Sequence, residues 1–225
     1  MNATNMAYTP EYQEQRKRWA AIFSSEYLSD TKTTELDEGY SAITRNYYGE
    51  VENCNLRASD TILLASSGEE IYRWRNLDNG GEFISVIRHS NGNIYLLFRI
   101  DLYGYGVYDL TNWKEFFYIP KERESFIWTG VNYNPVNDML AVSGCIWGAP
   151  FSLYLLDFSN PMAETKWVDV IELLEGGYDK YDALDFIRWD RDILVVLATE
   201  WFDTGGKIET VQKELAISES QYIGS

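Results

Sequence analysis

From Glu50 onward the sequence repeats one pattern: a candidate strand, a tight turn and a second, more apolar strand. The turn residues tolerate tight backbone geometry, and β-branched or aromatic residues flank each turn. Four such hairpins are predicted, over 50–66, 83–100, 126–146 and 183–199, with turns at 58–60, 89–92, 134–137 and 190–191. Because serial hairpins fold as antiparallel sheets, this repeat constrains the fold class more than any other feature.

A further strand is predicted after each hairpin, and a fourth in two of the copies. These strands are expected over 70–77, 105–110, 152–158, 207–215, 113–119 and 166–173. The second strands begin at about residues 61, 93, 138 and 192, a spacing in or near the range of blade repeats. Seventeen tyrosines, ten phenylalanines and eight tryptophans also favour β structure, because aromatic side chains suit pleated, half-buried surfaces.

One part of the repeat resembles a known family. Residues 134–144 combine a turn with a strand rich in small residues, and 152–158 read Ser-Leu-Tyr-Leu-Leu-Asp-Phe. Together they resemble one blade of a β-propeller of the Trp-Asp-repeat type, although the Gly-His dipeptide and the terminal Trp-Asp of that family are missing. The resemblance implies a binding scaffold and no particular activity, because propellers host many unrelated functions.

We therefore predict a mainly-β fold, a propeller-like array of about four antiparallel hairpin or blade units with an N-terminal helix. The alternative is an open, curved antiparallel sheet or a sandwich with the helix packed on it. In either case the aromatic and apolar strands supply the core.

The residues before the repeat predict a helix over 8–24 and a loop over 25–46. Thr9-Pro10-Glu11 supplies a capping hydroxyl, a proline at the first helical position and an acid in the first turn. The basic run 16–18 falls largely on the faces away from the apolar stripe, where it is solvated or clamps the helix to the body. We expect one domain over 1–225, with the β units over 47–217 and a tail over 218–225.

The charge balance limits the classes of partner. Nineteen basic and 35 acidic residues give a net charge of −16, which repels nucleic acid and anionic membrane but suits a basic protein partner. Two cysteines, Cys54 and Cys145, fit a reducing compartment. Because neither a signal peptide nor an apolar stretch of membrane-spanning length is visible, a cytoplasmic location is predicted.

The residues that could carry chemistry are few, and no catalytic residue, metal ligand or cofactor is predicted. His89 is the single histidine and lies in a predicted turn, so a surface position is expected. The glycines of 103–106 lack the third glycine and the helix of a nucleotide loop. A dense set of acids suits solvated loops, a patch for a basic partner, or metal or catalysis: Asp179, Asp182, Asp185, Asp190 and Asp192, with Glu200 and Asp203 beyond.

Three loops with aromatic residues follow the inner strands, at 101–105, 144–151 and 200–206. Equivalent loops of a common architecture share one rim, and exposed aromatic residues there make binding hot spots. The predicted anchors are Tyr103, Tyr105, Trp147, Phe151, Trp201 and Phe202, with charge from Asp101, Glu200 and Asp203.

These features favour a non-catalytic protein-interaction module. Its acidity suits an inhibitor or immunity-type protein that binds a basic partner. The alternative is a carbohydrate-active enzyme or a sugar-binding module that uses paired carboxylates and aromatic residues at the propeller mouth.

Overall fold

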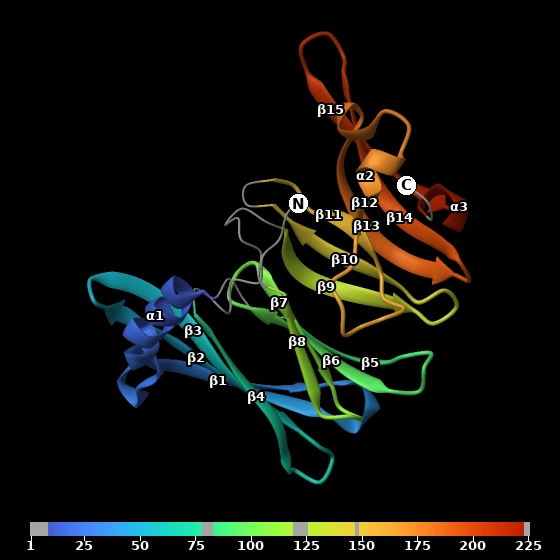
Figure 1. Cartoon of the computed structure of the whole chain (residues 1–225). Helices are drawn as coiled ribbons and strands as arrows, with labels where there is room; N and C mark the ends of the chain where they lie inside the picture. The colour runs from blue at the N-terminus through green and yellow to red at the C-terminus, as the bar shows by residue number, and fades with distance from the viewer. Residues whose placement is uncertain (1–8, 78–82, 119–125, 147–148, 223–225) are drawn as a thin grey trace. The chain divides into compact units, whose positions relative to one another are not determined.

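The computed structural model describes residues 9–77, 83–118, 126–146 and 149–222 (Figure 1). By their internal contacts the residues form two units. The first comprises Met1–Arg88 and Gly92–Arg123, and the second comprises His89–Asn91 and Glu124–Ser225. The prediction that the whole chain is one domain stays a prediction.

The first unit opens with helix α1 (Pro10–Trp19), which continues as a 3₁₀ turn over Ala20–Phe23. The Thr9 hydroxyl accepts a hydrogen bond from the Tyr12 amide at 3.3 Å, so the predicted N-terminal cap is present. The helix is followed by a four-stranded antiparallel sheet in the order β1 (Leu28–Glu35), β2 (Ser41–Val51), β3 (Cys54–Leu64) and β4 (Glu70–Leu77).

Two predictions for this region are wrong. The segment 25–46 is not a loop, because β1 and most of β2 lie within it. The first hairpin does not turn at 58–60 but at Glu52–Asn53, where φ is 50° and 62°. Two consecutive residues with positive φ match the right-handed twist of a two-residue hairpin, whereas 58–60 continue β3.

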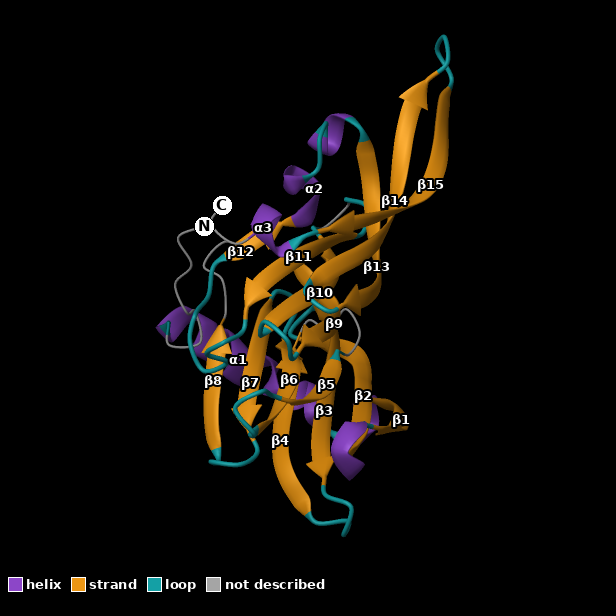
Figure 2. Ribbon diagram, turned by 90° about the vertical axis from the view of Figure 1, so that its right-hand side faces the viewer, coloured by secondary structure: helices purple, strands orange, loops and turns teal. Residues whose placement is uncertain are grey.

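The second sheet of the first unit has the order β5 (Ile84–Arg88), β6 (Ile94–Ile100), β7 (Gly104–Asp109) and β8 (Lys114–Tyr118), as predicted for this copy. Figure 2 shows these strands from the side. Trp74 of β4 and Phe98 of β6 lie 4.7 Å apart between ring centroids, within a buried cluster that also holds Leu63, Leu96 and Tyr108. The two sheets of this unit therefore share one core.

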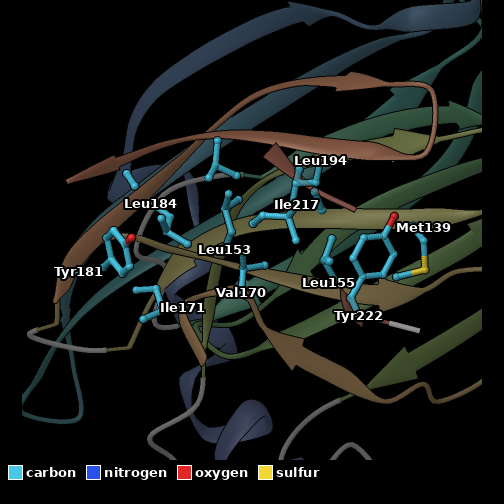
Figure 3. Packing of buried hydrophobic residues seen from close by; sticks show 13 residues of the cluster. Met139, Leu153, Leu155, Val170, Ile171, Tyr181, Leu184, Leu194, Ile217 and Tyr222 are labelled. Carbon is cyan, nitrogen blue, oxygen red and sulfur yellow. The ribbon is translucent and has the colours of Figure 1, made fainter. Parts of the chain in front are cut away.

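The second unit has a four-stranded and a three-stranded sheet. The strands are β9 (Ile127–Asn134), β10 (Met139–Cys145), β11 (Ser152–Asp157), β12 (Trp167–Asp169), β13 (Tyr181–Asp190), β14 (Ile193–Asp203) and β15 (Ile208–Ile217). Their orders are β12-β11-β10-β9 and β13-β14-β15. Figure 3 shows the core between them, in which Leu153, Leu194 and Ile217 are fully buried.

Two short helices differ from the expected strand and tail. The predicted strand over 166–173 ends early, because the Asp169 side chain accepts the Ile171 amide at 2.9 Å and starts helix α2 (Val170–Leu173). In the expected tail, helix α3 (Glu219–Tyr222) buries Tyr222, whose hydroxyl donates to the Asp192 carbonyl at 2.6 Å. Residues 223–225 lie outside the described part.

The predicted fold class is confirmed: the described residues form an N-terminal helix and four antiparallel sheets of three or four strands. In each sheet the strands follow chain order, so each is a simple meander. Among the described helices, none combines the length and the apolar character that a membrane crossing requires.

Candidate functional site

His89 lies in the β5–β6 turn, as predicted, but the expectation of a surface position is wrong. Its ring is 3% exposed and stacks on Tyr133 with 5.2 Å between centroids. Nε2 donates to the Phe158 carbonyl at 2.9 Å, and Nδ1 accepts the Asn91 amide at 3.1 Å. These two bonds and the stacked Tyr133 ring hold the His89 side chain within the second unit.

The loop between β6 and β7 does not present the predicted anchors. Tyr105 is 3% exposed and stacks on Tyr118 at 5.1 Å, because it is already part of buried strand β7. Tyr103 is half-buried. The prediction that Tyr105 is an exposed anchor is therefore wrong.

Asp101 is tied into the first unit rather than offered to a partner. Its carboxylate accepts the Leu77 amide at 2.7 Å and pairs with Arg16 at 2.8 Å, and the Tyr12 hydroxyl also donates to it. Burial raises the pKa of the Asp101 carboxyl to about 7, and the Leu77 amide acts against that rise. Arg16 thus clamps helix α1 to the body, which is the second of the two roles considered for the basic run.

The predicted residues of the β14–β15 hairpin divide into paired and exposed ones. Glu200 forms ion pairs with Lys180 at 3.4 Å and with Lys213, and these bonds lower its pKa. Asp203 accepts the Gly206 amide at 2.6 Å and so closes the hairpin turn. Trp201 is half-buried, whereas Phe202 is 42% exposed. Beyond Glu200, β14 pairs with β15 alone, and in Figure 2 this end projects from the sheet.

The β10–β11 loop borders a cavity of about 110 Å³ in the second unit. Ile146, Ala149, Pro150 and Ser152 of this region line it. The lining also includes four aromatic residues, Phe126, Tyr154, Tyr178 and Tyr181. Phe151 lies between two lining residues and is 52% exposed. Trp147, also predicted as an anchor, lies outside the described residues.

The structure brings two of the three predicted loops to the same strand. The Phe151 carbonyl accepts the Leu184 amide of β13 at 3.1 Å, and Glu200 is the register partner of Tyr181 on the same strand. The Trp201 amide also donates to the Lys180 carbonyl at 2.9 Å. The β10–β11 loop and the base of the β14–β15 hairpin are therefore neighbours in the second unit, whereas the 101–105 loop belongs to the first.

Exposed apolar and acidic residues line this cavity or lie close in sequence to residues that line it. Tyr178 is 52% exposed and Ile146 is 37% exposed. The Tyr178 hydroxyl donates to Asp169 at 2.5 Å, and burial together with this bond raises the pKa of the phenol. Three acids of the dense set predicted from sequence are exposed, namely Asp179, Asp182 and Asp185. Asp182 lines the cavity, and the other two lie three residues before and three residues after it in the chain.

Paired carboxylates at a cavity, which the carbohydrate alternative requires, are not found among the described lining residues. Asp182 is the one acid that lines the second-unit cavity, and no acid lines the first-unit cavity presented next. Within the described residues, no three His, Cys, Asp or Glu side chains gather as metal ligands.

Sequence reasoning missed a larger cavity, of about 310 Å³, in the first unit. Three arginines and five aromatic residues line it, with Asn76 and Ile100: Tyr12, Arg16, Tyr72, Arg73, Trp74, Arg75, Phe98 and Phe117. These residues come from α1, β4, β6 and β8, which are distant in sequence. The alternation Tyr72-Arg73-Trp74-Arg75 was a local signal, since it places rings and guanidinium groups on opposite faces of one strand.

Asp60, on the neighbouring strand β3, neutralises part of this positive charge. Its carboxylate is 1% exposed and accepts Arg73 Nε at 2.7 Å and Arg75 Nε at 3.2 Å. Burial alone would raise the pKa of Asp60, but the bonds and charges of Arg73 and Arg75 outweigh it, so the pKa lies below its usual value. Asp60 is therefore a buried ion-pair partner within β3, not the turn residue that the sequence predicted.

Comparisons with known proteins add little to this geometry. No family model matches the chain. Over 39 residues, 17% of this chain and 16% of the relative, it is 49% identical to an uncharacterized protein of Acanthamoeba polyphaga mimivirus. The chain therefore spans less than two thirds of the curated relative that it matches.

Two solved structures are similar at low scores. A fragment of HIRA matches with a TM-score of 0.37 and 11% identity, over 83% of this chain and 54% of that one. The acylaminoacyl peptidase of Pyrococcus horikoshii matches with a TM-score of 0.38 and 12% identity, over 84% of this chain and 32% of that one.

Proposed function

We propose that the chain is a protein-interaction module and that its partner docks on the second unit, around the β10–β11 loop. One observation carries the proposal: Phe151, Tyr178 and Ile146 are exposed together at the margin of a small apolar cavity. Apolar anchors beside a concavity that can receive a partner side chain are typical of binding hot spots. We name this surface, defined by these three residues and the cavity, the docking patch.

Charge suggests the chemistry of the partner. Asp179, Asp182 and Asp185 are exposed, and in the segment 169–185 the six acids outnumber a single lysine. Lys180 is already paired with Glu200, so it does not offset these three acids. A basic segment with a protruding apolar side chain fits such a surface, because opposite charges steer the encounter and the apolar contact slows dissociation.

The exposed end of the β14–β15 hairpin extends the docking patch. Phe202 and Val211 project from the same face of the hairpin, since Phe202 is opposite Glu209 and Val211 is opposite Glu200. Both side chains are exposed. The proposed patch lies within one unit and does not include Tyr105 or Asp101, and the shared rim of all three loops stays a prediction.

The test is a comparison of variants in affinity capture from cells that contain the native partner. Phe151→Ser with Tyr178→Ser removes the two most exposed anchors, and Val136→Ser serves as the matched control. Val136 is 65% exposed, belongs to the same unit and lies in the β9–β10 turn, away from the lining residues. We expect a basic protein to be recovered by the wild type and by the control, and to be lost with the double variant.

A second measurement distinguishes specific binding at the docking patch from non-specific hydrophobic adsorption. Association of the purified pair should slow as salt rises, because the attraction between acids and a basic partner is screened. Equal recovery by the double variant and the wild type would contradict the proposed surface. Association that does not depend on salt would contradict the basic character of the partner.

A further inference from the structure

The first-unit cavity runs along the free edge of β4. Five consecutive residues of that strand, Tyr72–Asn76, line it, although neighbouring side chains of a strand point to opposite faces. A cavity touched by both sets lies beside the strand rather than above one face. β4 is the last strand of its sheet, so that edge has no neighbouring strand within the sheet.

The backbone of β4 presents donors to this cavity. The Arg75 carbonyl accepts Arg16 Nη2 at 2.5 Å, and the Leu77 amide donates to Asp101, so both residues direct their backbone groups away from β3. In an antiparallel ladder, residues whose backbone N–H and C=O point toward the partner strand alternate with residues whose groups point away from it. The register between β3 and β4 is regular from Asp60↔Arg75 to Ile62↔Arg73, so this alternation continues from Leu77 to Arg73. The amides of Arg75 and Arg73 therefore face the free edge as well.

The arginines among the lining residues are only partly neutralised by acids. Arg16 is matched by Asp101, but Arg73 and Arg75 share the single buried carboxylate of Asp60. Arg75 uses only Nε in that bond, and among the described residues its remaining contact is the Phe23 ring, 4.6 Å from the guanidinium carbon. One guanidinium charge is thus left without a carboxylate of its own.

Aromatic rings also line the cavity, and two acids outside the lining act on lining residues. Tyr72 and Trp74 stack at 6.0 Å, and Phe98 and Phe117 also line the cavity. Glu115 accepts the Tyr72 hydroxyl at 3.0 Å, and the charge of Glu70 acts on Arg73. A negative group would therefore bind beside Arg75, and a flat apolar body would extend toward Tyr72 and Phe117.

We propose that this cavity binds a small organic anion with a flat aromatic body. Its volume of about 310 Å³ is at the lower end of the range for small-molecule pockets. Arg75 and the edge amides of β4 would hold the anionic group, and the aromatic wall would bind the ring. In a chain of net charge −16, this local reversal of sign directs such a ligand to one place.

The experiment uses the full chain and two probes of nearly equal shape. Naphthalene-2-sulfonate carries the charge, and the neutral 2-(methylsulfonyl)naphthalene does not. In isothermal titration calorimetry we expect one site per chain for the sulfonate, with a Kd of about 1 mM or tighter. The neutral probe should bind about tenfold more weakly, since it lacks the charge-assisted bonds to the guanidinium group.

Arg75→Gln tests whether Arg75 binds the anion, and a second variant that loses the same charge elsewhere in the unit is the control. Arg57→Gln is the control, because Arg57 is exposed on β3 of the same unit and stacks on Tyr48, not on the cavity. Arg75→Gln should weaken sulfonate binding about fivefold or more, and Arg57→Gln should leave it within twofold. Arg75→Lys keeps the charge and should recover part of the affinity, which separates anion binding from a general loss of structure.

Three results would overturn the assignment. The first is equal affinity for the charged and the neutral probe. The second is an equal loss of affinity in Arg75→Gln and Arg57→Gln, because bulk charge would then explain the effect. The third is the absence of saturable sulfonate binding by the wild type at millimolar probe concentrations.

Discussion

The two cavities of this chain differ in where their acids lie. In the first unit Asp60 is 1% exposed and pairs with two arginines that are among the residues lining the cavity. In the second unit the acids are exposed, no arginine or lysine is among the described lining residues, and tyrosines with apolar side chains form the wall. The net charge of −16 therefore does not predict the local charge at either cavity, because the two units distribute their acids and cations differently.

Strand register explains the difference. In the first unit Asp60 of β3 is opposite Arg75 of β4 and diagonal to Arg73, so one carboxylate reaches two guanidinium groups. In the second unit Glu200 of β14 lies diagonal to Lys213 on β15, and both Lys213 and Lys180, which precedes β13, pair with it. The exposed acids Asp179, Asp182 and Asp185 form no ion pair with a lysine or arginine among the described residues. The comparison predicts that acids of the first unit act on stability and acids of the second on association.

The largest expected effect is on the stability of the first unit. Asp60→Ala leaves two guanidinium groups without their carboxylate and should lower the free energy of unfolding by about 2–3 kcal/mol. This is less than a fully buried pair loses, because Arg73 and Arg75 are 40% and 46% exposed. Asp182→Ala, on an exposed acid of the second unit, should change it by less than about 0.5 kcal/mol. Urea unfolding measures both, and equal losses would contradict the distinction.

Acid pH provides a second test of Asp60. The bonds and charges of Arg73 and Arg75 hold its pKa below the unfolded value despite burial, so the folded state favours the charged form. The stabilisation is present above the unfolded pKa, about 4, and is lost as the pH falls through the lower, folded pKa. Urea midpoints between pH 6 and pH 3 should therefore fall further in the wild type than in Asp60→Asn. Parallel curves would show that Asp60 does not contribute.

The sequence was sufficient for those parts of the fold that local patterns determine. The turn at 89–92 and the strand 70–77 are confirmed, and the turns predicted at 134–137 and 190–191 each lie one residue later, at 135–138 and 191–192. Turn residues and apolar alternation are signals within a few residues, so these parts could be predicted locally. The first hairpin was misplaced because Ala58-Ser59-Asp60 has the composition of a turn. What keeps Asp60 in a strand is a pair of arginines more than ten residues away, and such compensation is not visible in a local window.

The candidate sites were less predictable for the same reason. The unusual composition of 144–151 identified a loop that borders the second-unit cavity, and the segment 200–206 contacts the same strand, β13. The prediction for Tyr105 was wrong because a tyrosine between two glycines has the local composition of a loop. Only its pairing with Arg99 shows that it belongs to a strand. The arginine-lined cavity joins α1, β4, β6 and β8, so only the folded chain assembles it.

A charge change in the second unit should act on association and leave stability nearly unchanged. Replacing Asp179, Asp182 and Asp185 by asparagine should slow association with the captured partner about tenfold at low salt and flatten the salt dependence. Arg75→Gln in the first unit should leave both measurements unchanged. Stopped-flow or surface-based kinetics at several salt concentrations measure the rates, and an unaltered slope in the triple variant would remove these acids from the interface.

The smallest expected effect separates the ring of Tyr178 from its hydroxyl. Tyr178→Phe loses the 2.5 Å hydrogen bond to Asp169 but keeps the exposed ring beside the cavity. Because this bond is half-exposed and Asp169 retains its bond to the Ile171 amide, the free energy of unfolding should fall by only about 0.5 kcal/mol. Partner affinity should stay within twofold of the wild type, whereas Tyr178→Ala should lose about tenfold, since the apolar contact is then removed. Equal affinity of the two variants for the partner, measured by calorimetry, would mean that the ring does not contact it, and the docking patch would then have to exclude Tyr178.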